Sequence, residues 1–166
     1  MVLLEVDGCT NYTVLSEADR AQGNAEPPHG RDDSTLKPGW YRFQGAAGDR
    51  MPDKCVPLNH CGVKFPGWLN DTHPTVAEGV VTRKVCYDNW DYYWYGSNDC
   101  CYLSSNIRVR NCGAFFVYEL QKPPRCDLRY CGNASSAGKL PCLIFLSLSV
   151  NNQSSSDHHH RSSNKL

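Results

Sequence analysis

The chain lacks net charge, long apolar runs and any visible leader. Its 166 residues hold 17 Lys and Arg against 17 Asp and Glu, whereas proteins that bind nucleic acid or anionic lipid carry a basic surplus. The longest apolar run, residues 143–150, is broken by Ser147 and Ser149. Like residues 1–6, it falls short of the roughly 20 residues of a membrane span. No secretory signal is visible. We therefore predict no nucleic-acid partner and no membrane span in this chain.

Motifs of catalysis are missing as well. The sequence has no Gly-x-Ser-x-Gly, no His-Glu-x-x-His and no phosphate-binding glycine loop. Asp32 and Asp33 are adjacent, but they lie in residues 23–38, where glycine, proline and charge indicate a loop. We interpret them as solvated carboxylates rather than as a catalytic pair. The prediction is a protein that is not an enzyme and needs no cofactor.

Cysteine is what the sequence has in excess, with ten residues: Cys9, Cys55, Cys61, Cys86, Cys100, Cys101, Cys112, Cys126, Cys131 and Cys142. Structural zinc sites use cysteines two to four residues apart, and no Cys-x-x-Cys occurs here. The adjacent pair Cys100–Cys101 suits two bridges leaving one strand in different directions. We expect disulfides and no metal, and hence an oxidising compartment. Spacing does not give the pairing, because ten cysteines allow roughly a thousand connectivities.

Composition divides the chain into a core and a tail. The stretch from Gly39 to Cys131 holds the aromatic residues and most cysteines, whereas residues 132–166 hold nine serines, a His triplet and one aromatic residue, Phe145. Such a tail buries too little surface to offset its ordering entropy. We predict a domain over residues 1–131 and a disordered Ser-rich tail over residues 132–166.

Within the core, apolar residues recur with a period of two. Residues 40–43, 80–85, 107–110 and 114–118 are rich in aromatic or β-branched residues, and Pro123–Pro124 ends the last of them. The cluster of Trp40, Tyr41 and Phe43 reads as core. The one helix-like piece is residues 14–21, with Ser16 as its cap. The predicted fold is mainly β: a small, irregular, disulfide-rich domain with little helix.

Glycosylation triplets support a secretory route. Asn11-Tyr12-Thr13 and Asn70-Asp71-Thr72 lie beside loop signals in the cysteine-rich part, where a surface glycan is expected. The triplets at Asn133 and Asn152 fall in the Ser-rich tail and read as coincidence. We predict glycans at Asn11 and Asn70.

Longer stretches resemble a known family. They comprise Gly-Trp-Tyr-Arg-Phe at 39–43, residues 50–57, Trp-Leu-Asn-Asp-Thr-His-Pro at 68–74, residues 78–86, Cys-Cys at 100–101, residues 116–120 and Pro-Pro-Arg-Cys-Asp-Leu-Arg-Tyr-Cys at 123–131. In this order, and with residues 9–15 as an opening, they are similar to the cysteine-rich domain of uromodulin and the pancreatic secretory granule glycoprotein. The resemblance covers residues 9–131.

That resemblance implies a secreted or surface-anchored glycoprotein module without catalytic activity, with a structural or adhesive role. Its partners would be other extracellular domains or glycoproteins, and glycans. Four bridges are implied: Cys9–Cys112, Cys55–Cys100, Cys61–Cys131 and Cys86–Cys101. In the family a signal peptide precedes the domain and a zona pellucida module follows it, so we expect this chain to be a fragment.

The sequence departs from the family pattern at three further points. The family has a further cysteine shortly before the Gly-Trp-Tyr-Arg-Phe stretch, and the loop here has none. This leaves Cys126 without its family partner; Cys142 could replace it, or both could be free thiols. The family's glycan acceptor before the Pro-Pro pair is absent. The loop between Cys86 and Cys100 is longer and carries an aromatic cluster of Trp90, Tyr92, Tyr93, Trp94 and Tyr95.

This aromatic loop, residues 87–99, suggests a different class of function. Sugars and protein partners stack on Trp and Tyr faces, which give contact area at low entropic cost. The alternative to a purely structural module is therefore a lectin-like module that binds glycan or protein through the loop. A simpler explanation is that some of these rings cover the disulfide core.

Overall fold

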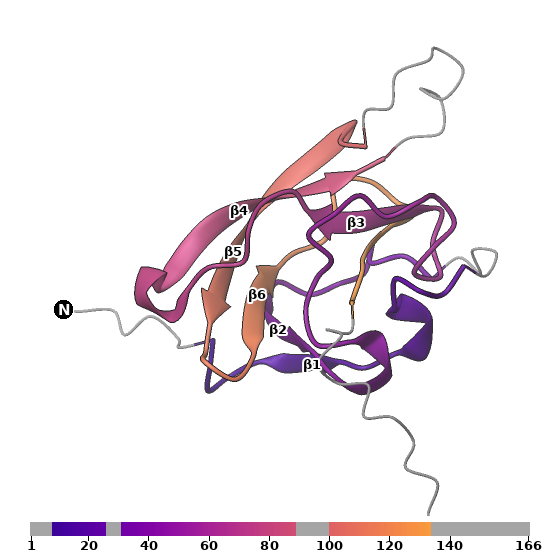
Figure 1. The fold of residues 1–166 in the computed structure, drawn as a ribbon. Helices are drawn as coiled ribbons and strands as arrows, with labels where there is room; N and C mark the ends of the chain where they lie inside the picture. Colours follow the sequence, from indigo (N-terminus) through magenta and orange to yellow (C-terminus); the bar gives the residue numbers. More distant parts are fainter. Residues whose placement is uncertain (1–7, 26–30, 89–99, 134–166) are drawn as a thin grey trace, which may run out of the picture.

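The computed structural model describes residues 8–25, 31–88 and 100–133 (Figure 1). Strand is the main regular secondary structure of these residues, with short 3-10 turns between the strands, which agrees with the mainly β prediction. In chain order the elements are β1 Thr13–Leu15, η1 Ala18–Arg20, β2 Gly39–Phe43, η2 Gly45–Ala47, β3 Phe65–Leu69, η3 Val76–Glu78, β4 Val80–Tyr87, β5 Leu103–Asn111, β6 Phe116–Leu120 and β7 Leu128–Tyr130.

The seven strands form one sheet in the order β1-β2-β6-β5-β4-β3-β7. The pairs β1–β2 and β3–β7 are parallel, and the others are antiparallel. Isolated bridges then join Ala21 to Gly132 and Arg50 to Asn133. Because Ala21 follows β1 and Gly132 follows β7, the two edges of the sheet come together and the sheet curls.

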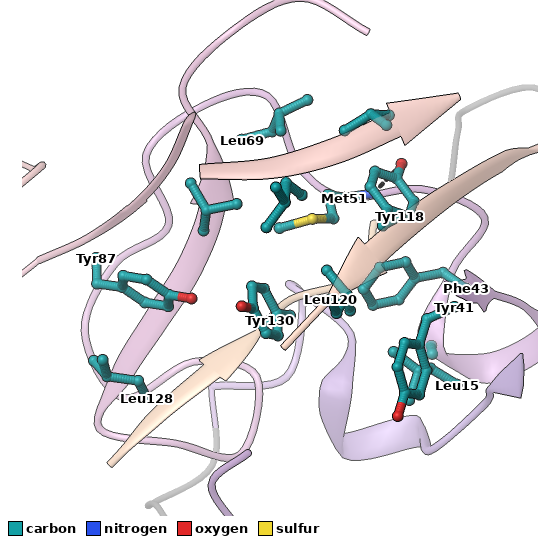
Figure 2. Packing of buried hydrophobic residues seen from close by; sticks show 14 of the residues in the cluster. Leu15, Tyr41, Phe43, Met51, Leu69, Tyr87, Tyr118, Leu120, Leu128 and Tyr130 are labelled. Atoms are coloured by element: carbon teal, nitrogen blue, oxygen red, sulfur yellow. Dashed lines mark hydrogen bonds between the residues drawn. The ribbon is translucent and has the colours of Figure 1, made fainter. Parts of the chain in front are cut away.

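One face of the curled sheet packs around the main core (Figure 2). Alternation places residues of one parity inside, so that β5 buries Ile107 and Val109 while Arg108 and Arg110 stay partly exposed. The core is rich in tyrosine, with Tyr87, Tyr118 and Tyr130 fully buried. The Tyr130 hydroxyl donates to the Gln121 carbonyl at 2.9 Å, which satisfies a polar group inside the core.

β3 does not alternate, because all five of its residues are buried. It lies between β4 and β7 and holds a glycine, Gly67, where the backbone passes the ring of Tyr87 closely. A Cβ on Gly67 would lie 2.5 Å from that ring. A second cluster of buried residues contains Trp68 of β3 together with Val56, Cys61, Cys86 and Cys131.

The strand predictions at 40–43, 80–85 and 107–110 are confirmed by β2, β4 and β5. The strand predicted at 114–118 lies two residues further on, as β6. The helix predicted over residues 14–21 is wrong in its first half: Val14 and Leu15 belong to β1, and the 3-10 turn begins only at Ala18. Ser16 is exposed and makes no cap. Residues 13–15 form a strand because they pair in parallel with β2, and such tertiary contacts override a weak helix propensity.

The interpretation of Asp32 and Asp33 as solvated carboxylates is wrong for Asp33, whereas Asp32 stays partly exposed. Asp33 is 3 % exposed, and its oxygens accept from Arg20 at 2.8 and 2.9 Å and from the Tyr130 amide at 2.9 Å. Asp32 accepts from Ser34 and from the Asp127 amide at 2.9 Å. Both carboxylates therefore fasten the loop before β2 to the segment around β7.

Candidate functional site

Four disulfides cross-link the described residues: Cys9–Cys112, Cys55–Cys100, Cys61–Cys131 and Cys86–Cys101. These are the pairs that the family resemblance implies. They span 103, 45, 70 and 15 residues with Cα–Cα distances of 5.7, 6.0, 5.6 and 4.6 Å, all within bridging range. In the chain-entropy model, each bridge taken singly contributes about 3–5 kcal/mol by restricting the unfolded chain.

The adjacent cysteines send their bridges in two directions. Cys100 is joined to Cys55 in the loop before β3, whereas Cys101 is joined to Cys86 in β4. Trp68 packs in the same cluster, and its indole N–H donates to the Cys100 carbonyl at 3.1 Å. The base of the aromatic loop is thus fixed at both ends, at Cys86 and at Cys100–Cys101.

Of the cysteines in the described ranges, Cys126 is the one outside a disulfide, and it is exposed. Cys142 lies outside the described residues, so the pairing of these two stays a prediction. Next to Cys126, the Asp127 amide is bonded to Asp32, as described above. This hydrogen bond joins the turn at Cys126 to the loop in which the family's missing cysteine would be sought.

Both predicted glycan acceptors are exposed on the described surface. Asn11 lies just before β1, and Asn70 follows β3. The loop after Asn70 is held by Arg83, whose side chain donates to the Thr72 carbonyl at 2.9 Å and to Glu78 at 3.2 Å. The acceptor triplets therefore stand where a glycan can be attached without unfolding the sheet.

Two neighbouring hollows lie over β2, β6 and β5, and Asn11 lines the first of them. The first, of about 650 Å³, is lined by Asn11, Trp40, Arg108 and Glu119 among others. The second, of about 530 Å³, shares Arg108 and Glu119 with it. The Arg108 guanidinium bonds to Glu119 at 2.8 Å and lowers the pKa of that carboxyl. This polar surface was not found from the sequence alone. Arg108 and Glu119 meet only because β5 pairs with β6, and no sequence motif marks that pairing.

His73 forms a polar centre under the loop that follows Asn70. Its Nε2 lies 2.9 Å from the hydroxyl of buried Tyr118, which accepts from the Met51 amide at 2.9 Å. Its ring lies 4.6 Å from that of Phe116. Burial, aided by the nearby positive charge of Arg50, lowers the pKa of His73 to about 4. His73 is therefore neutral at physiological pH.

Several of the predicted site residues lie outside the part of the chain that the structure describes. The aromatic residues Trp90, Tyr92, Tyr93, Trp94 and Tyr95 lie outside the described residues, as does most of the predicted tail. Within residues 8–25, 31–88 and 100–133, no three His, Cys, Asp or Glu side chains are grouped to hold a metal ion. No helix of that part is long and apolar enough to cross a membrane.

Comparison with known proteins gives a consistent set of relatives. A family model described as a uromodulin-like domain matches residues 41–132. The pancreatic secretory granule membrane major glycoprotein GP2 of Canis lupus familiaris is 46 % identical over 132 residues, which cover 79 % of this chain and 24 % of that protein. Human GP2 is 38 % identical over 126 residues, covering 75 % of this chain and 22 % of its own. Mouse uromodulin is 40 % identical over 131 residues, covering 78 % and 19 %. The chain spans about a quarter of the length of these relatives or less.

Proposed function

Since the chain belongs to the family of uromodulin-like cysteine-rich domains, we propose that it is an extracellular, N-glycosylated module with a structural or adhesive role and no catalytic activity. The observation that carries the proposal is the disulfide frame. Four bridges hold a sheet in which each edge strand has only three residues. Disulfides of this density persist in the secretory pathway and outside the cell.

The arrangement supports a rigid display unit. The fixed core and the exposed acceptors Asn11 and Asn70 lie on the same body, so that a glycan at either position would be held at a defined place on the sheet. Partners would be neighbouring extracellular domains and glycoproteins. A whole protein containing this chain would take its further activities from the parts that this chain does not cover.

The proposal is tested by secretion from mammalian cells. We expect glycopeptide mapping to find sugars at Asn11 and Asn70, and non-reducing peptide mapping to find the four bridges. We also expect the folded module to resist trypsin until a reductant is added, because its many Lys and Arg sites lie on a cross-linked frame. Unoccupied acceptors together with eight reactive thiols would contradict the proposal.

The lectin-like alternative concerns the loop of residues 87–99 and stays a prediction. A glycan array comparing the wild type with a Trp90→Ala/Trp94→Ala variant tests it. Binding that disappears in the variant would support it, whereas no binding, or equal binding by both proteins, would exclude it.

A further inference from the structure

A row of side chains crosses four strands on the face opposite the main core (Figure 1 labels the strands). Trp40 of β2 pairs with Glu119 of β6, Glu119 pairs with Arg108 of β5, and Arg108 pairs with Thr82 of β4. Directly paired residues share one face of a sheet. Their chain neighbours on the other face, such as Tyr118 and Val109, belong to the core. The row therefore lies on the outer face.

The centre of this row is charged and accessible. Arg108 and Glu119 form a two-pronged ion pair whose side chains are 39 % and 35 % exposed. The Arg108 guanidinium also lies 5.6 Å from the centre of the Trp40 ring. Because the pKa of Glu119 is lowered by this pairing, the carboxylate stays ionised at neutral pH. The pair offers both donor and acceptor groups to a polar ligand.

The two hollows described above meet over this ion pair, and we call them together the Asn11 groove. They share Pro38, Gly39, Arg108 and Glu119 in their lining. Gly39 leaves the floor open, since a Cβ there would meet nothing nearer than 4.0 Å. Each hollow has a volume in the range of small-ligand sites. At one end of the groove stands an exposed glycan acceptor, Asn11.

Resting on the proposal that Asn11 is glycosylated, we propose that the first two N-acetylglucosamines of its glycan lie in the Asn11 groove. Such sugars have an apolar C–H face, which suits exposed Pro38 and the edge of Trp40, a residue that is 9 % exposed. Their hydroxyl and acetamide groups suit Arg108 and Glu119. A tether raises the local sugar concentration to the millimolar range. At that concentration, a contact with a Kd of about 0.2 mM, too weak to capture dilute free sugar, is populated for about 80 % of the time and stabilises the fold by about 1 kcal/mol.

The consequence is a glycan that acts as part of the fold. From Asn11, just before β1, it would reach over β2, β6 and β5 and fasten a three-residue edge strand to its neighbours. Asn70 provides the matched comparison. It is equally an exposed acceptor, but it lines neither hollow. A glycan at Asn70 would extend into solvent and add little to stability.

The test uses the secreted chain with ¹³C-labelled sugars, after glycopeptide mapping. We expect nuclear Overhauser contacts from the first two sugars of Asn11 to Pro38 and the Trp40 indole, with line widths of the folded protein. Glu119→Gln should weaken these contacts. Thr13→Ser keeps the acceptor triplet and Thr13→Ala removes it, so Thr13→Ala should melt at least about 3 °C lower. Thr72→Ala and Thr72→Ser, the matched pair at Asn70, should differ by less than about 1 °C.

Narrow, freely mobile signals for the Asn11 sugars, or equal melting of the two Thr13 variants, would overturn the groove proposal. Enzymatic removal of the glycan from folded wild type repeats the comparison if Thr13→Ala fails to fold. A glycan found at Asn70 but not at Asn11 would also overturn it and leave the glycoprotein proposal standing. Absence of sugar at both positions would defeat both proposals.

Discussion

His73 is expected to make this domain less stable in mild acid than at neutral pH. The folded state holds the imidazole neutral mainly because the ring is buried, with the positive charge of Arg50 nearby. Its Nε2 lies 2.9 Å from the hydroxyl of Tyr118. Protonation places a positive charge in a mostly buried site near Arg50, and the nearby carboxylates of Asp53 and Asp49 offset this only in part. The unfolded chain has no such restriction, so protons favour unfolding.

The size of the effect follows from the two pKa values. His73 has a pKa of about 4 in the fold against 6.5 for an unperturbed histidine. Because the folded value is the lower one, this contribution to stability is complete above pH 6.5 and is lost as the pH falls towards 4. The linkage relation gives a loss of about 2 kcal/mol at pH 5 and about 3 kcal/mol at pH 4.

Urea unfolding of the secreted domain at pH 7.5, 5 and 4, followed by Trp fluorescence, measures this loss. Carboxylates with lowered pKa values, such as Glu119, also stabilise the fold less once they are protonated in acid. A measurement on the wild type alone is therefore not decisive. His73→Gln keeps an acceptor for Tyr118 but does not titrate. His60→Gln, in a part-buried loop position, controls for loss of a histidine. The wild type and His60→Gln should lose about 3 kcal/mol more than His73→Gln between pH 7.5 and 4.

Equal acid sensitivity of the wild type and His73→Gln would refute the reasoning. So would an NMR titration that places the pKa of His73 above 6 in the folded protein. In either case burial against Phe116 and Tyr118 would have to be weaker than the structure shows, or Asp53 and Asp49 would have to outweigh Arg50.

Three further predictions concern the frame. Asp33→Asn should lower the free energy of unfolding, measured in urea, by about 3 kcal/mol, because it removes the buried charge partner of Arg20 and leaves only the exposed Glu17; a loss under about 1 kcal/mol would contradict the role of Asp33. Gly132→Ala should prevent secretion of folded protein, because its Cβ would overlap a backbone carbonyl of η2. Gly23→Ala, where the added Cβ has open space around it, should be secreted normally. Equal yields of the two variants would argue against the close approach of Gly132 to η2. Alkylation of the secreted, non-reduced chain should label no cysteine other than Cys126 and Cys142; labelling of any of the other eight would show a different pairing.

The strands β2, β4 and β5 could be predicted because their signals are local: β-branched and aromatic residues that alternate with polar ones. The segment of residues 14–21 could not, because a short apolar stretch fits a helix turn or a strand equally well. Its pairing with β2 decided between them. The burial and ion pairing of Asp33 could not be predicted from the local sequence either. Nothing near it in the sequence reveals that Arg20 lies buried beside it or that the Tyr130 amide, 97 residues away, is its second partner.

The sequence by itself determined the mainly β class, the oxidised cysteines and, through family resemblance, which cysteines pair. Those properties depend on residue type, short-range order and long ordered matches. Only the tertiary structure decided that Asp33 is a buried clamp, that His73 is held neutral, and that Arg108 and Glu119 face a groove beginning at Asn11. Each of these depends on groups brought together by strand pairing and chain closure. Their energies come from burial and proximity, which are properties of the fold and not of any local stretch of sequence.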